Sequence, residues 1–232
     1  NIKPIDKDRI IYEDENYIIA LKKVGELSQK SNKKDISINE KILAYLYRKN
    51  EWDAGDGFTP GIANRLDRNT EGLIIFSKTL YGAKLISELI KNREVRKFYI
   101  ALAEGVFPDE GTTVLDAYLI KDEKTNTEKI IKDPDINDKD INKKPVSIKT
   151  SYRKIKELPE GTLVEIELIT GKSHQIRAHM ASVSHPLVGD KKYGGSGRRG
   201  YFLRAYKLVF PKDERLNGLC GKTIEISENL KK

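Results

Sequence analysis

The chain has 232 residues, of which 38% are hydrophobic, so it is long enough to bury one large core or two small ones. Lysine and arginine outnumber aspartate and glutamate by 43 to 35, and the formal charge of +8 favours a polyanionic partner. The single cysteine, Cys220, excludes an intramolecular disulfide and a thiolate zinc site, and no apolar run approaches the roughly 20 residues that span a bilayer. We therefore expect a soluble cytoplasmic protein with no membrane association.

The N-terminal region predicts a hairpin followed by a helix. Residues 9–23, RIIYEDENYIIALKK, are typical of two strands around a turn at residues 14–16. The helical period begins after Ser37, which forms a capping-box pattern with Glu40, and continues to Asn50.

A second strand and a second helix are predicted after a loop rich in glycine, proline and aspartate. The apolar run from Leu73 to Phe76 indicates a buried strand, and Thr79 is placed to cap the helix that follows. The apolar residues that recur every three or four positions in this helix are Leu80, Ala83, Ile86 and Ile90.

The remainder alternates mostly like strands, with one short helix at residues 173–183 and a solvated loop at residues 132–144. The predicted strands are KFYIALAEG, TTVLDAYLI, VSIKTSYRKI, TLVEIELIT, YFLRAYKLVF and KTIEI. Because strands outnumber helices and do not alternate with them regularly, we predict an α+β fold with a large, mixed, mostly antiparallel sheet and flanking helices.

Three patterns resemble ligand sites but fail on context. Residues 195–200 have the GxGxxG spacing of a dinucleotide site, and residues 216–223 end like a phosphate-binding loop, yet a strand follows each where a helix is required. His174 and His179 are five residues apart, on different sides of a helix, so we expect no metal site.

The stretch from Asn64 to Gly72, NRLDRNTEG, places Asp67 between Arg65 and Arg68 just before an apolar run. A polar turn is one interpretation, because aspartate and asparagine readily bond their own backbone. It leaves the two arginines unexplained. Burial raises the pKa of a carboxyl group and a nearby guanidinium lowers it, so the pattern also suits a partly buried carboxylate that must stay ionised to act as nucleophile or base.

Two later segments carry further candidate side chains. In residues 171–195 Ser173 is placed to cap the short helix, so that His174 and Arg177 share one basic face. A cationic, solvated helix is the alternative there. In RKFYIALAEG, Tyr99 shares one face of its strand with Lys97, where a tyrosine of the core is the alternative.

Taken together and in this order, NRLDRNTEGLIIFSK, RKFYIALAEG and GKSHQIRAHMASVSHPLVGDKKYGG resemble the signature segments of the RluA-type pseudouridine synthases. The resemblance implies isomerisation of uridine in RNA to pseudouridine by a catalytic domain over residues 1–232, with a bisected sheet and no metal or organic cofactor. It further implies that Asp67 is the nucleophile or base, that Tyr99 stacks on the target base, and that Arg177 pairs with the catalytic carboxylate.

The resemblance also implies the partner and the remaining site residues. The RNA is expected to be large-subunit ribosomal RNA, with transfer RNA as the alternative. Independently of the resemblance, we expect a monomer, because no strongly apolar surface helix stands out in the sequence. Substrate contacts are expected from Asn64, Arg65, Arg68, Thr70 and His174. Many relatives carry an N-terminal RNA-binding domain, which we expect to be missing from this chain.

The sequence departs from the family pattern at two positions and leaves two rival functions open. Asn64 stands where the family most often has histidine, and Glu71 where it often has serine or glycine. One rival is an RNA-binding module without activity. The other is a metal-dependent nuclease that uses Asp67 with Asp190 or Asp56.

Overall fold

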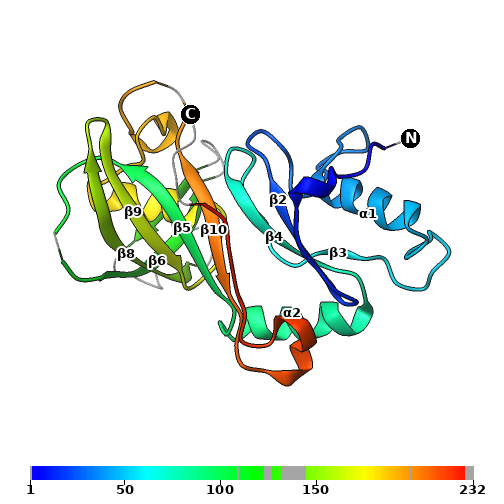
Figure 1. Ribbon diagram of the computed structural model, residues 1–232. Helices are drawn as coiled ribbons and strands as arrows, with labels where there is room; N and C mark the ends of the chain where they lie inside the picture. The colour runs from blue at the N-terminus through cyan, green and yellow to red at the C-terminus, as the bar shows by residue number, and fades with distance from the viewer. Residues whose placement is uncertain (1, 109, 123–126, 132–144, 199, 228–232) are drawn as a thin grey trace. The chain divides into compact units, whose positions relative to one another are not determined.

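The computed structural model describes residues 2–108, 110–122, 127–131, 145–198 and 200–227, and the chain forms two compact units (Figure 1). Unit 1 comprises Asn1–Val95 together with Ala205–Lys232, and unit 2 comprises Arg96–Arg204. The loop predicted over residues 132–144 lies outside the described residues. Segments from both ends of the chain therefore build unit 1.

The strands of unit 1 are ordered β1-β2-β4-β10, with β3 paired to β4 and β11 paired to β10. Their bounds are β1 Ile10–Glu13, β2 Tyr17–Lys22, β3 Gly61–Ile62, β4 Glu71–Ser77, β10 Leu203–Val209 and β11 Thr223–Glu225. The predicted hairpin is confirmed, since β1 and β2 are antiparallel. Its turn forms because one oxygen of Asp14 accepts from the backbone N–H groups of Asn16 and Tyr17 at 2.8 and 2.7 Å.

Two helices flank these strands (Figure 1), and local capping explains where both begin. The capping box predicted at Ser37 and Glu40 is confirmed at the start of α1, Ile38–Arg48. Thr79 caps α2, Leu80–Lys91, by accepting from the N–H of Gly82.

The buried face of α2 matches the predicted apolar pattern only in part, since Ile86 enters the core and Ile90 packs against it. Leu80 is half exposed, whereas Leu85, Ile86 and Leu89 enter the core of unit 1. A stripe at positions 85, 86 and 89 follows helical spacing as well as the predicted one does, and packing against the sheet selects between them.

The described part of unit 2 contains five antiparallel strands in the order β5-β9-β8-β6-β7. They are β5 Arg96–Ala103, β6 Thr113–Asp122, β7 Thr127–Ile131, β8 Val146–Leu158 and β9 Gly161–Leu168. The sequence did not predict β7, because its five residues TEKII carry too little alternation. The α+β class with mostly antiparallel strands is confirmed.

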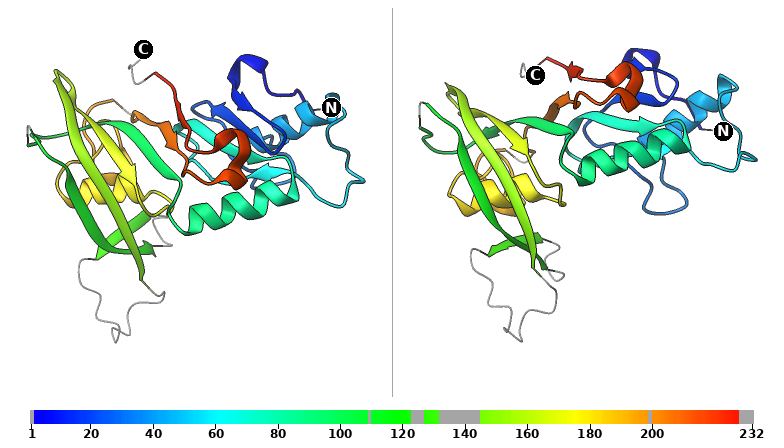
Figure 2. Two further views of the ribbon diagram at one scale, coloured as in Figure 1. Left: turned by 60° about the horizontal axis from the view of Figure 1, so that its bottom comes forward. Right: turned by 90° about the horizontal axis from the view of Figure 1, so that it is seen from below.

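The helix α3, Gln175–Ser182, covers one face of the unit 2 strands (Figure 2). Ala178 packs into a cluster with Ala117, Leu119 and Ile148 from β6 and β8. The predicted cap at Ser173 is wrong. His174 occupies the N-cap in the left-handed conformation, with φ 52°, and makes no side-chain cap bond.

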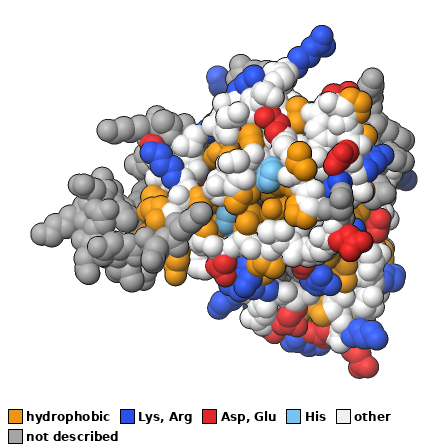
Figure 3. Space-filling view, turned by 90° about the vertical axis from the view of Figure 1, so that its left-hand side faces the viewer, with side chains coloured by type: hydrophobic (Ala, Val, Ile, Leu, Met, Phe, Trp, Pro, Cys, Tyr) orange, Lys and Arg blue, Asp and Glu red, His pale blue; other side chains and the backbone are white. Residues whose placement is uncertain are grey.

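The alternative of a cationic, solvated helix is wrong for α3, because the helix is buried from Gln175 through Met180. Hydrophobic side chains gather at the middle of the face in Figure 3, with histidine side chains among them. All three histidines lie in unit 2, and the ring of His185 stacks on Phe107 with centroids 4.1 Å apart.

The structure confirms that a strand follows each of the two glycine-containing segments that resemble nucleotide-binding motifs. β10 follows residues 195–200, and β11 follows residues 216–223, so neither glycine run opens a helix. Short 3₁₀ helices occur at Lys7–Arg9, Lys191–Tyr193 and Glu214–Leu219. Within the described residues, no helix is both long and apolar enough to cross a membrane.

Candidate active site

The backbone of the loop that carries Asp67 is held by side chains from a distant segment. The buried hydroxyl of Ser28 donates to the carbonyl of Leu66 at 2.7 Å and accepts from its N–H at 3.0 Å. The same loop is closed on itself, because the N–H of Thr70 donates to the carbonyl of Asp67 at 3.0 Å. Asp67 therefore lies within a turn whose backbone is fixed on both sides.

Lys22, at the end of β2, adds a buried cation beneath this loop. Its ammonium donates to the carbonyls of Lys23, Arg68 and Thr70 at 3.1, 3.1 and 2.7 Å, and its side chain is fully buried. Burial lowers the pKa of Lys22 to about 8, and the negative charges of Glu26, Asp67 and Glu71 oppose that shift. The negative charge of Asp67 is thus one of three that favour the charged form of Lys22.

Two of the predicted substrate contacts, Asn64 and Arg68, are bonded to the fold. The amide oxygen of Asn64 accepts from the N–H of Ile75 at 2.7 Å, and its amide nitrogen donates to the carbonyl of Leu73 at 3.4 Å. Arg68 is exposed, and its Nε donates to the carbonyl of Gly25 at 3.1 Å. The Asn64 amide thereby joins the start of the loop to β4.

The other three predicted side chains of this loop differ in exposure. Arg65 is exposed, Asp67 is half-buried and Thr70 is buried. The Thr70 hydroxyl oxygen has no hydrogen-bond partner among the residues that the structure describes. Their contacts with substrate stay predictions.

Gly72 ends the loop where two strands approach closely. Its φ is +129°, and a Cβ at this position would lie 2.2 Å from the carbonyl oxygen of Ala205 on β10. Only glycine allows both the backbone conformation and the approach.

Tyr99 and α3 lie on the same face of the unit 2 sheet. Tyr99 on β5 is opposite Ile166 on β9, which is opposite Tyr152 on β8, so their side chains share a face. Thr150, two residues before Tyr152, accepts a hydrogen bond from Gln175 of α3 and shares another with Nδ1 of His179. Tyr99 is 4% exposed, and Lys97 beside it on this face is 7% exposed.

Arg177 on α3 forms a buried, bidentate ion pair. Its Nε and Nη2 donate to the two carboxylate oxygens of Asp190 at 2.7 and 2.8 Å. The guanidinium also lies over the rings of Tyr193 and Tyr201, 4.8 and 4.5 Å from their centroids. The expected pairing of Arg177 with Asp67 stays a prediction, because Asp67 belongs to unit 1 and Arg177 to unit 2.

The three histidines have separate partners in unit 2. Nδ1 of His174 forms a hydrogen bond with the hydroxyl of Tyr193 at 2.9 Å. Nδ1 of His179 bonds the hydroxyl of Thr150 at 2.9 Å, and Nδ1 of His185 bonds the carbonyl of Glu104 at 2.8 Å. Among the described residues, no three histidine, cysteine, aspartate or glutamate side chains are grouped as metal ligands.

Sequence reasoning missed Lys22, Ser28 and the role of Asp190 as a partner of Arg177. The one local signal for Lys22 was its position at the end of an apolar strand. A lysine buried there needs several hydrogen-bond acceptors, and the local sequence does not show where these come from. No local pattern marks Ser28 or Asp190, because their partners are 38 and 13 residues away.

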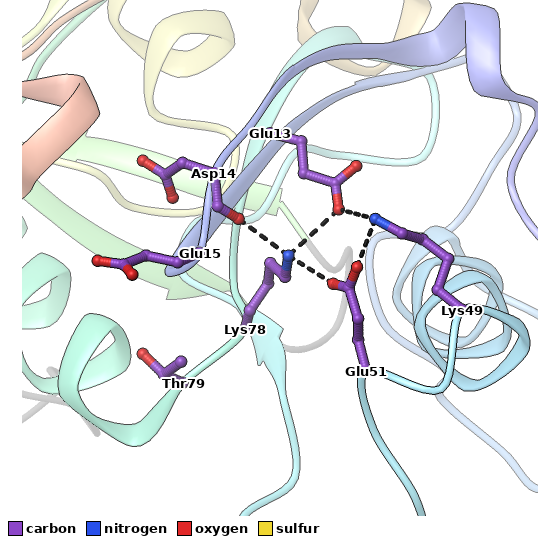
Figure 4. Close-up of a pocket in the computed structure, with 7 residues that line it drawn as sticks. All are labelled: Glu13, Asp14, Glu15, Lys49, Glu51, Lys78 and Thr79. Carbon is purple, nitrogen blue, oxygen red and sulfur yellow. Dashed lines mark hydrogen bonds and ion pairs between the residues drawn. The ribbon is translucent and has the colours of Figure 1, made fainter.

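An open pocket elsewhere in unit 1 is occupied by its own ion pairs (Figure 4). Lys49 and Lys78 each bridge Glu13 and Glu51, at distances from 2.5 to 3.2 Å. The remaining lining residues are Asp14, Glu15 and Thr79. Since both lysines bind both glutamates, the ring joins β1, the end of α1 and the start of α2.

Residues 16–182 match the RNA pseudouridylate synthase family. The chain belongs to this family. The matched range contains Asp67, Tyr99 and Arg177, together with all five predicted substrate contacts.

Curated relatives and solved structures agree with this assignment. The chain is 34% identical over 219 residues to an uncharacterized RNA pseudouridine synthase of Mycoplasma genitalium, covering 90% of this chain and 65% of that protein. It is 33% identical over 235 residues to the ribosomal large subunit pseudouridine synthase C of Rickettsia bellii, covering 98% of this chain and 70% of that protein.

The fold matches a human family member. The structure titled human RNA pseudouridylate synthase domain containing 4 superposes with a TM-score of 0.69 at 21% identity, covering 88% of this chain and 84% of that chain. The chain spans about two thirds of the length of the two bacterial relatives.

Proposed function

We propose that the protein isomerises specific uridines in RNA to pseudouridine. The observation that carries the proposal is the family match over residues 16–182, which includes the loop around Asp67 and all of α3. In this reaction the bond between N1 of uracil and the ribose breaks, the base turns, and C5 is joined to the ribose. C5 releases its proton and N1 takes one up, so the composition of the RNA is unchanged. Neither redox chemistry nor hydrolysis is involved, so side chains alone are sufficient.

We assign Asp67 as the nucleophile or base, with Tyr99 and Arg177 completing the catalytic group. The fixed backbone around Asp67 supports this assignment, because a catalytic carboxylate needs a defined position. We further propose that residues 1–232, which include both units, make up the catalytic domain; Asp67 belongs to unit 1, and Tyr99 and Arg177 belong to unit 2.

A stacked uridine must leave the RNA helix to reach a carboxylate, at a cost of a few kcal/mol. Phosphate contacts from the exposed Arg65 and Arg68 offset part of that cost. Stacking on Tyr99 contributes roughly 1 to 3 kcal/mol. Asn64, Thr70 and His174 complete the proposed substrate contacts.

The decisive experiment uses RNA transcribed with uridine tritiated at C5 and is run in EDTA. We expect release of tritium to water while the RNA keeps its length, and no release by Asp67→Ala. Asp116→Asn is the matched control, because Asp116 is an exposed carboxylate that pairs with Lys149 on the sheet of unit 2.

Other outcomes identify the rivals. Salt-sensitive RNA binding without tritium release indicates a binding module, and strand cleavage that requires a divalent ion indicates a nuclease. Release that survives Asp67→Ala removes Asp67 from the catalytic group.

We propose large-subunit ribosomal RNA as the substrate, because two kinds of curated relative are named as synthases of the ribosomal large subunit. Parallel assays with a large-subunit ribosomal transcript and a transfer RNA transcript separate the two substrates. We also propose that the protein is a monomer, which light scattering of the purified protein tests. We propose further that it is located in the cytoplasm, which cell fractionation tests.

A further inference from the structure

Arg177 is enclosed by three side chains that all come from the segment after α3, namely Asp190, Tyr193 and Tyr201. We propose that Asp190 is a positioning residue, which fixes the guanidinium of Arg177 before RNA binds. The inference rests on the proposed function only for the role of Arg177 in the reaction. The contacts themselves lie entirely within unit 2.

The carboxylate side of this arrangement is rigid. Asp190 is 1% exposed, its N–H donates to the carbonyl of Leu187 at 3.0 Å, and its carbonyl accepts from Tyr193 and Gly195 at 3.0 and 2.9 Å. A Cβ on Gly195 would lie 2.1 Å from the carbonyl oxygen of Leu187, so the turn requires glycine there. The two oxygens of Asp190 therefore have a fixed position.

The two tyrosines restrict the plane of the guanidinium. A cation over an aromatic face is attracted to it, and Arg177 is within 5 Å of two such faces. Tyr193 is itself held, because its hydroxyl accepts from the N–H of Glu128 at 2.9 Å and bonds Nδ1 of His174 at 2.9 Å. The arrangement thereby links β7, the N-cap of α3 and the loop that follows Asp190.

Such an arrangement does little for stability alone. Replacing a buried ion pair by packed hydrophobic side chains is often neutral or stabilising, because burial of two charges costs as much as their attraction returns. What a bidentate pair does provide is a single orientation of a side chain that otherwise has many rotamers. Asp190 binds the Nε edge of the guanidinium, so the orientation of the Nη1 end is set by the protein rather than by the substrate.

The first test measures the single-turnover rate of tritium release and the affinity for the same RNA transcript. We expect Asp190→Asn to slow release by about 10- to 100-fold, because small displacements of a catalytic group have effects of this size. RNA affinity should change by less than about threefold. The matched control is Glu165→Gln, whose carboxylate pairs with Arg153 in the same unit at 2.7 Å and should leave the rate unchanged.

The second test is a double-mutant cycle. If Asp190 acts only through Arg177, Asp190→Asn adds nothing to the loss caused by Arg177→Met. Additive losses, or a wild-type rate in Asp190→Asn at a temperature well below its melting point, overturn the proposal. Should Asp190→Asn fail to fold, Asp190→Glu keeps the charge, displaces the carboxylate by one methylene and should show the same loss.

A third readout does not depend on activity. The Nε–H of Arg177 should give a slowly exchanging nuclear magnetic resonance signal in the RNA-free protein, and Asp190→Asn should abolish that protection. If Asp190→Asn loses the signal but the wild-type protein releases no tritium, the positioning contact is supported and the proposed function is wrong. A rapidly exchanging Nε–H in the wild-type protein overturns the positioning role.

Discussion

Replacing Lys22 by methionine should change how the stability of the protein depends on pH. Lys22 is fully buried, and burial lowers its pKa from 10.5 to about 8. Because the folded-state pKa is below the unfolded one, the unfolded chain binds more protons between pH 8 and 10.5. The free energy of unfolding therefore rises with pH across this window, and below pH 8 the protein carries the full cost of a buried charge.

The size of the effect follows from the shift. At about 1.4 kcal/mol for each unit of pKa, Lys22 contributes a rise of about 3 kcal/mol over the whole window and about 2.5 kcal/mol from pH 7 to pH 10. Lys22→Met lacks the titrating group, so its stability relative to wild type should fall by about that amount as pH rises from 7 to 10.

Urea unfolding of both proteins at several pH values from 7 to 10 measures this difference directly. Lys49→Met is the control, because glutamate partners raise the pKa of Lys49 and its titration begins only above this range. A stability difference between wild type and Lys22→Met that is constant from pH 7 to 10 would refute the reasoning.

Three further substitutions test other features of the two units. Gly72→Ala should lower the free energy of unfolding by at least about 2 kcal/mol in a urea titration, because the added Cβ meets the carbonyl of Ala205 at 2.2 Å. Burial lowers the pKa of His179 to about 4, so the unfolded state protonates first, and stability should fall by about 3 kcal/mol as pH falls from 6.5 to 4. His179→Leu should lack that dependence. Ser28→Ala removes both hydrogen bonds to Leu66, so it should lower the free energy of unfolding by about 1 to 3 kcal/mol in a urea titration. It should also slow tritium release from RNA by the purified variant.

Each of these substitutions has a distinguishing outcome. Gly221→Ala is the control for Gly72, because its nearest contact is the flexible Lys212 side chain at 3.3 Å, so equal losses would contradict the steric argument. A His179→Leu variant that keeps the acid dependence would assign it to other groups. Full activity of Ser28→Ala would show that the hydroxyl is dispensable for the loop around Asp67.

Features governed by neighbouring residues were predictable from the sequence. The caps at Ser37 and Thr79 and the turn at Asp14 depend on contacts two or three residues along the chain, and all three are present. The family resemblance also came from contiguous segments, which preserve their spacing whatever they pack against.

Features that depend on distant partners were not predictable in this way. The charge on α3 left a solvated helix open as an alternative, yet Arg177 is buried because Asp190 compensates its charge and two tyrosines cover it. Likewise Lys22 is buried because the carbonyls that accept from it belong partly to residues 46 and 48 positions later. Helical and strand periodicity contains no information about such pairs.

The attachments of the Asp67 loop also limit how that loop can be moved between proteins. Ser28 and Lys22 hold it from 38 and 48 residues away. A host scaffold given only the nine residues NRLDRNTEG would receive a carboxylate with no backbone support. A working transplant needs the strand end at Lys22 and the following turn through Ser28 as a second piece, placed in the same register against the first.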